Sequence, residues 1–276
     1  MSPAWMLIPF GLGAVLGWLG GLFGIGGGII AIPMLGIFFG MDQQLAQGTA
    51  LVMIVPTVLV GLWRYFRHSR IDARIAFTLA GSASICTYAA ARVAMHLDAR
   101  DLRIAFAGFL VLLAAYLVFR VMHARSIENT PVPVAWPWSS LVGAAGGLLS
   151  GMFGVGGAMI APPALSICFG MSQKEAQGLA LALKAPSTVV ALITYAQSGE
   201  VDWTMGFALA AGGTTCVSAG VALAHQLPEN ALRIMFCGLI CIAAVMLAIR
   251  SLQDDSARNG MQELLGFVRL FWTIAK

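Results

Sequence analysis

Apolar stretches of about 20 residues, separated by short polar segments, recur along the chain and predict helices that cross a membrane. In the first half these stretches lie near 45–65, 74–96 and 102–122, and in the second half near 175–196, 204–226 and 232–250. Each set of three follows a Gly-rich apolar segment (about 5–23 and 139–153), a glycine break (24–28 and 154–157) and a short apolar segment (29–40 and 159–170). Because the short segment cannot span a bilayer as a straight helix, we expect a glycine-broken helix pair in each half.

The two halves are copies of one unit. Residues 13–108 align with 143–238 at a constant offset of 130 positions without a gap, and about 40 of the 96 pairs are identical. Self-similarity of this length predicts a structural repeat. We therefore divide the chain into repeat 1 (1–122), a linker (123–138), repeat 2 (139–252) and an amphipathic tail (253–276) that is typical of an interfacial helix.

Charge predicts that the two copies are inverted relative to each other. Segment 64–74 holds four arginines and one aspartate, whereas its counterpart 194–204 holds two acidic residues and no basic one. Lys and Arg favour the cytoplasmic side, so we expect these equivalent loops on opposite sides of the membrane, as in many secondary transporters. A same-direction repeat with eight spans stays an alternative, and the broken pair is either two full crossings or a re-entrant hairpin.

Composition agrees with an all-α polytopic membrane protein. Of the 276 residues, 59% are hydrophobic and 10% are charged, against about 25% charged residues in a soluble domain. The net charge of +4 fits a bias in cytoplasmic loops, and no basic patch interleaved with aromatic residues indicates nucleic-acid binding. The N-terminus has neither the basic region nor the cleavage site of a signal peptide, so we expect it to form the first membrane segment.

The glycine breaks are the strongest candidate for a binding site. Irregular backbone at membrane depth is tolerated where it lines a cavity, and free amides at a helix N-terminus favour an anion. Close packing of helices is the alternative role for these glycines. The breaks match neither a P-loop nor a dinucleotide-binding motif. They contain Gly24, Gly26, Gly27 and Gly28 in the first copy, and Gly154, Gly156 and Gly157 in the second.

Lys184 lies in the otherwise uncharged segment 176–195, where a charge costs about 3 kcal/mol on insertion scales. Its counterpart in the first copy is Ile54, so the repeat does not need a lysine there in order to fold. We expect Lys184 to supply positive charge to a bound anion; a lysine that snorkels or pairs internally is the alternative. No Asp or Glu lies at the centre of a membrane segment, which argues against a carboxylate site for cations.

Neutral hydrogen-bonding side chains near these features are candidates to complete an oxyanion site, although bonding between helices is an equal alternative. They are Gln47 and Gln177, each in an Ala-Gln-Gly sequence, together with Thr49, Thr57 and Ser187. With the glycines and Lys184 they form the predicted substrate-binding set. Asp72 and Asp202 precede apolar segments and are expected to cap helices. No catalytic triad or metal-ligand cluster is visible, so we predict no enzyme, metal or cofactor.

At these residues the chain resembles the TauE/SafE family of sulfite exporters, also called the four-toluene-sulfonate uptake permease family. The resemblance rests on the motif G-x-F-G-x-G-G-G/A-x-I-x-x-P-x-L at 21–35 and 151–165, on Ala-Gln-Gly, and on the Pro-Thr and Pro-Ser steps at 56–57 and 186–187. It implies proton-coupled transport of sulfite, related sulfur oxyanions or organosulfonates across a bacterial inner membrane. Ala158, where the first copy has Gly28, departs from the motif, and Lys184 has no match in the first copy.

The expected function is therefore a secondary transporter of small anions that works in a lipid bilayer by alternating access. An anion channel of the same architecture is the first alternative. The second is a membrane protein that transfers sulfur through one of its five cysteines, although none of these has zinc or redox spacing. The third is a structural partner of a larger complex. Substrate, direction of transport, coupling ion and oligomeric state, with a homodimer as one option, stay open.

Overall fold

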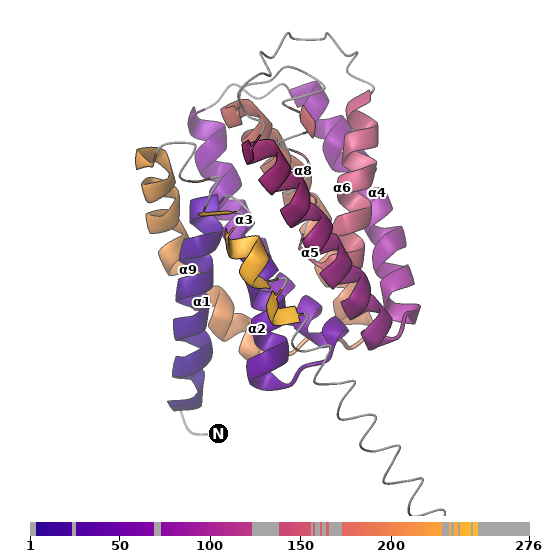
Figure 1. Cartoon of the computed structure of the whole chain (residues 1–276), viewed down its shortest axis with the longest axis vertical. Helices are drawn as coiled ribbons and strands as arrows, with labels where there is room; N and C mark the ends of the chain where they lie inside the picture. Colours follow the sequence, from indigo (N-terminus) through magenta and orange to yellow (C-terminus); the bar gives the residue numbers. More distant parts are fainter. Residues whose placement is uncertain are drawn as a thin grey trace, which may run out of the picture.

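A computed structural model describes residues 4–23, 26–68, 73–122, 138–155, 157, 161, 164–165, 173–227 and most of 232–247. Side chains at some helix ends, including 64–68 and 173–177, lie outside this description. The described part is built from helices and contains no strand (Figure 1). In chain order the helices are α1 (Ala4–Phe23), α2 (Gly28–Phe39), α3 (Gln43–His68), α4 (Ala73–His96), α5 (Ala99–Met122), α6 (Ser139–Phe153), α8 (Gln173–Gln197) and α9 (Trp203–Gln226).

The helices have the length and surface of a membrane protein. Four described segments are long and apolar enough to cross a bilayer: Met6–Phe23, Gln43–Trp63, Gly178–Gln197 and Trp203–Ala224. Helices α4 and α5 have 24 residues each, whereas α2 and α6 are shorter, with 12 and 15. Large apolar side chains such as Phe77, Leu112 and Phe207 are exposed on the outside, where a bilayer would cover them. The predicted class, an all-α membrane protein, is confirmed.

Two helix pairs lie at opposite edges of the bundle, with α3 and α8 between them (Figure 1). Helix α1 packs along α9 at one edge, and α6 packs along α4 at the other. At the offset of 130 positions seen in the sequence, α6 corresponds to α1 and α9 corresponds to α4. Each Gly-rich helix therefore packs on a long helix of the other half of the chain, and the two pairs join equivalent helices.

Both edge pairs depend on a stripe of glycines at intervals of four residues. A Cβ atom on Gly13, Gly17 or Gly21 would lie within 3.0 Å of the α9 backbone, so only glycine allows the helices this close. These glycines face Leu209, Gly213 and Val217 in turn, and Gly143, Gly147 and Gly151 face Leu79, Ala83 and Thr87. The contacted residues of α9 also lie 130 positions after those of α4. The contacted positions rise together along both helices of a pair, so these helices run parallel.

Helices α3 and α8, which correspond in the sequence repeat, run antiparallel through the centre. Tyr195, near the end of α8, bonds to Gln47 near the start of α3. Leu181, in the first half of α8, lies 3.9 Å from the Cβ position of Gly61 in the second half of α3. Equivalent helices with opposite directions are what inverted copies require. Which side of the membrane each end faces stays a prediction.

Other expectations meet the structure only in part. Asp202 caps α9 by accepting a hydrogen bond from the Met205 amide, as expected, whereas Asp72 lies outside the described residues. The linker before 138, the tail after 252 and much of segment 159–170 also lie outside the description. The division into two repeats, linker and tail therefore stays a prediction.

Candidate functional site

The first glycine break is a backbone reversal beside the middle of α3. Gly26 and Gly27 have φ angles of 70° and 75°, in the left-handed region that glycine enters without steric cost. Gly27 stands at the N-terminus of α2. The Gly26 amide donates to the Gly20 carbonyl across 3.3 Å, which folds the reversal back onto α1. Ile54 of α3 covers the bend from the other side.

The second break begins at the end of α6 and touches the first. Gly154 has a φ of 67°, and its amide donates to the Ser150 carbonyl over 3.0 Å, which ends the helix. A Cβ atom on Gly28 would lie 3.7 Å from the Cα of Val155. The structure therefore brings the described parts of the two breaks together. Gly24 and Gly156 lie outside the described residues.

Lys184 reaches the first break from α8, although it belongs to the second half of the chain. Its side chain is 0% exposed. The ammonium nitrogen lies 3.3 Å from the position that a Cβ atom on Gly26 would occupy. Ile54, the counterpart of Lys184 in the sequence repeat, is equally close to this position. The absence of a side chain at Gly26 thus leaves the space into which the ammonium projects.

Thr57 and Ser187 flank this region, but their hydroxyl groups bond within their own helices. Thr57 Oγ1 is 2.8 Å from the Ile54 carbonyl, and Ser187 Oγ is 3.0 Å from the Lys184 carbonyl. Such bonds use the hydroxyl proton and leave only oxygen lone pairs for another partner. As arranged here, neither residue offers the free donor that the sequence suggested.

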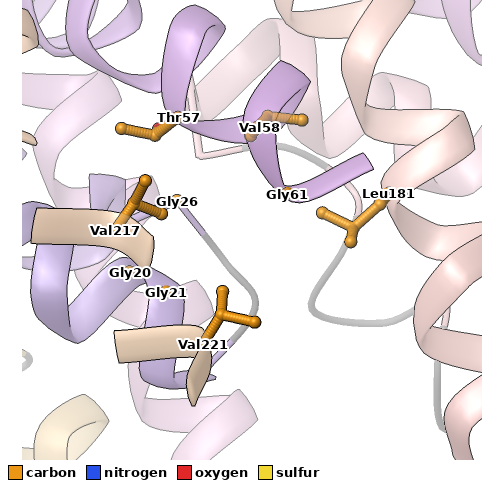
Figure 2. A pocket seen from close by; sticks show the side chains of 9 residues that line it. All are labelled: Gly20, Gly21, Gly26, Thr57, Val58, Gly61, Leu181, Val217 and Val221. Carbon is orange, nitrogen blue, oxygen red and sulfur yellow. The ribbon is translucent and has the colours of Figure 1, made fainter. Parts of the chain in front are cut away.

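A small cavity adjoins the first break, and Figure 2 shows its lining. Thr57, Val58 and Gly61 of α3 face Val217 and Val221 of α9, with Gly20, Gly21, Gly26 and Leu181 completing the wall. Its volume of about 20 Å³ holds about one water molecule. A polyatomic anion does not fit in this cavity unless the helices around it move apart.

The two other predicted side chains that the structure describes lie nearer the start of α3. Gln47 is fully buried; its Oε1 accepts a hydrogen bond of 2.6 Å from the Tyr195 hydroxyl. Thr49 Oγ1 accepts the Asp202 amide at 3.0 Å, so this hydroxyl supports the loop before α9. Gly157 packs closely on Gly146 of α6, and the Gln177 side chain lies outside the description.

Sequence reasoning missed two polar residues in this region: Tyr195 bonds to Gln47, and Ser150 precedes by four residues the Gly154 position that Gln47 contacts. Tyr195 was visible only as a residue that recurs, as Tyr65, in the first copy. Ser150 gave no signal, because a lone serine in a Gly-rich segment reads as helix packing. Both are fully buried beside the end of α6, where Tyr195 also approaches the Gly151 carbonyl at 3.3 Å.

Comparison with known proteins agrees with this architecture. A family model described as "Sulfite exporter TauE/SafE" matches residues 9–247. A probable membrane transporter protein of Xylella fastidiosa strain 9a5c is 27% identical over 251 residues, covering 88% of this chain and 95% of its own. The probable membrane transporter protein YdhB of Bacillus subtilis is 26% identical over 230 residues, covering 83% and 92% respectively.

The similarity extends to archaea. The probable membrane transporter protein MJ0441 of Methanocaldococcus jannaschii is 23% identical over 253 residues, covering 86% of this chain and 93% of its own. No solved structure matches. Since the family model covers most of the chain and the bundle has membrane-spanning helices, the protein belongs to the TauE/SafE sulfite exporter family, whose matched relatives are named as probable membrane transporters.

Proposed function

We propose that this protein is a secondary transporter of small anions, with sulfite, related sulfur oxyanions or organosulfonates as substrates, in a bacterial inner membrane. The observation that carries the proposal is the position of Lys184. Its ammonium group is completely buried and projects into the bend at Gly26, where the described parts of the two glycine breaks meet. An anion bound at this bend would face a cation and the first amides of α2, since the Gly26 amide already bonds to the Gly20 carbonyl.

The free energy of a buried ammonium group supports an anion as the ligand. Removing a charge from water costs several kcal/mol, of order 3 kcal/mol at the centre of a membrane helix. An anion beside Lys184 would offset this cost, whereas a cation or a neutral solute would not. The family name and the absence of acidic residues from α8 beyond Glu175 agree with this choice.

The same group offers a way to couple anion and proton movement. A bound anion stabilises the protonated form of a neighbouring lysine, and the protonated lysine in turn stabilises the bound anion. Because this linkage is reciprocal, a change in proton concentration on one side of the membrane changes anion affinity on that side. Proton coupling is therefore part of the proposal.

Alternating access is supported by the arrangement of the helices. The α1–α9 and α4–α6 pairs are tightly packed units at opposite edges of the bundle, and α3 and α8 cross between them (Figure 1). The cavity of about 20 Å³ beside Gly26 is too small for the anion. Movement of one pair relative to α3 and α8 would open this region to one side at a time.

The test is sulfite flux into proteoliposomes under an imposed pH gradient, measured for wild type, Lys184→Met and Arg92→Met. Arg92 is the matched control, because it is an exposed cation that stacks over Tyr88 on the outside of α4. We expect saturable flux in wild type and in Arg92→Met, and a loss of at least tenfold in Lys184→Met. Equal flux in all three proteins would refute the role of Lys184. Flux that does not saturate and ignores pH would indicate the channel alternative.

A further inference from the structure

Two buried polar groups near the end of α6, one on α3 and one on α6 itself, have no hydrogen-bond partner among the described residues. Gln47 and Ser150 are both 0% exposed. Gln47 Nε2 and Ser150 Oγ bond to none of the residues that the structure describes. Leaving a buried donor without an acceptor is costly, and native proteins rarely do so without a reason. The pair therefore indicates that something else supplies the missing acceptors.

The orientation of the Gln47 side chain is set by Tyr195. The distance of 2.6 Å between the Tyr195 hydroxyl and Gln47 Oε1 suits an O–H donor and is short for an N–H donor. The amide oxygen therefore faces Tyr195, and the NH₂ group points away from it with both protons unused. The Tyr195 hydroxyl also lies 3.3 Å from the Gly151 carbonyl, and this longer contact holds the hydroxyl against α6.

Gln47 and Ser150 adjoin the same turn of α6. A Cβ atom on Gly154 would lie 3.2 Å from the Cβ of Gln47, so the Gln47 side chain rests directly on this glycine. Ser150 precedes Gly154 by four residues, and positions four apart share a face of a helix. The amide of Gly154 also bonds to the Ser150 carbonyl, which confirms that the helical turn between them is intact.

The site lies apart from the Lys184 centre. Tyr195 follows Lys184 by eleven residues on the same helix, which corresponds to about 16 Å along the axis. The first half of the chain has no equivalent of Ser150, because Gly20 occupies that position. Gln47 has the counterpart Gln177, but the combination of a glutamine with a serine does not recur at the equivalent positions.

We propose that Gln47 and Ser150 form a second binding subsite, which accepts oxygen atoms of the transported oxyanion, and that Tyr195 positions Gln47 for this contact. Uncharged amide and hydroxyl donors bind the oxygens of an anion without the deep trapping that a second cation would cause. This inference rests on the proposed function, since it assigns the same substrate a second binding position between Lys184 and one face of the bundle. A trapped water molecule is the other occupant that such donors hold.

The test compares sulfite affinity in purified full-length variants. Affinity is obtained from the rise in unfolding temperature with added sulfite in detergent, and from the KM of flux in proteoliposomes. Ser150→Ala and Gln47→Leu should each lower the affinity for sulfite about tenfold, as expected for the loss of a hydrogen bond to a charged group. Thr194→Val is the control, because this buried hydroxyl already bonds to the Val190 carbonyl of its own helix. It should leave affinity unchanged.

Tyr195→Phe tests positioning rather than contact. If Tyr195 acts through Gln47, Tyr195→Phe weakens sulfite binding when it is the only change. It has no further effect in a protein that already carries Gln47→Leu. A general structural role would instead give equal losses in both backgrounds. Since the two donors come from different helices, the second variant still decides the matter if the first does not fold.

Each outcome is distinguishable from failure of the transport proposal. Wild-type affinity for sulfite in both Ser150→Ala and Gln47→Leu would overturn the subsite and leave the transporter proposal intact, with water as the occupant. If wild type neither binds nor transports sulfite, thiosulfate and a small sulfonate replace it as probes. If none of these anions stabilises the wild-type protein, the subsite falls together with the anion proposal.

Discussion

The close approach of α1 and α9 makes Gly17→Ala the most informative change to the fold. Gly17 faces Gly213, and a Cβ atom at Gly17 would come within 3.0 Å of the backbone of that residue. Backbone atoms cannot rotate out of the way as the end of a side chain can. The two helices would have to separate by roughly 1 Å along a line of contacts that is close-packed on both sides.

The magnitude follows from two opposing contributions. Alanine favours a helix over glycine by up to about 1 kcal/mol, whereas inserting a methyl group into a packed interface costs typically about 1–3 kcal/mol. Gly11→Ala on the same helix isolates the second contribution, because nothing lies within 4 Å of its Cβ position. We therefore expect Gly17→Ala to be about 1–3 kcal/mol less stable than Gly11→Ala.

The assay is reversible unfolding of the purified protein by SDS in mixed micelles, followed by circular dichroism. Gly147→Ala, the change at the corresponding position of α6, should cost a similar amount, because its Cβ would collide with the Ala83 backbone. Equal free energies of unfolding for Gly17→Ala and Gly11→Ala would refute the reasoning. That result would mean that the helices relax around the methyl group, or that they lie further apart than described.

Three further predictions concern two left-handed glycines, a helix cap and the cysteines. Gly26→Ala and Gly40→Ala should each lose about 1–2 kcal/mol of stability, because both glycines have a left-handed backbone. Only Gly26→Ala should reduce flux at least tenfold, since Gly40 has open space around it. Equal flux in the two variants would contradict the crowding at Gly26. Asp202→Ala should lower the free energy of unfolding by about 1 kcal/mol, because the Met205 amide loses its cap; an unchanged SDS midpoint would argue against the cap. Replacing all five cysteines with serine should leave saturable sulfite flux, whereas its loss would favour the sulfur-transfer alternative.

Much of the architecture was readable from local pattern. The length of an apolar segment reports a membrane helix because bilayer thickness sets how many residues are needed. Repeated glycines at a short interruption indicated a break in the helix, and the structure has left-handed residues at Gly26, Gly27 and Gly154. Lys184 was conspicuous for the same reason: a charge in an apolar segment is costly wherever that segment packs.

Long-range contacts were not readable in this way. The pattern of α1 shows that it has a small-residue face but not that α9, about 200 positions later, is its partner. Likewise, the hydroxyl of Thr49 is occupied by the Asp202 amide, Gln47 by Tyr195, and Ser150 by no described residue. A polar residue in a membrane helix has the same local sequence signal whether or not a partner is present.

The sequence by itself determined that this chain is a helical membrane protein with two glycine interruptions and one lysine at membrane depth, because segment length, composition and backbone freedom are properties of neighbouring residues. Only the tertiary structure decided that Lys184 faces the bend of the other half of the chain, and that two donors beside α6 find no acceptor among the residues that the structure describes. Those facts depend on how helices distant in sequence approach one another, and that approach is set by packing over the whole bundle.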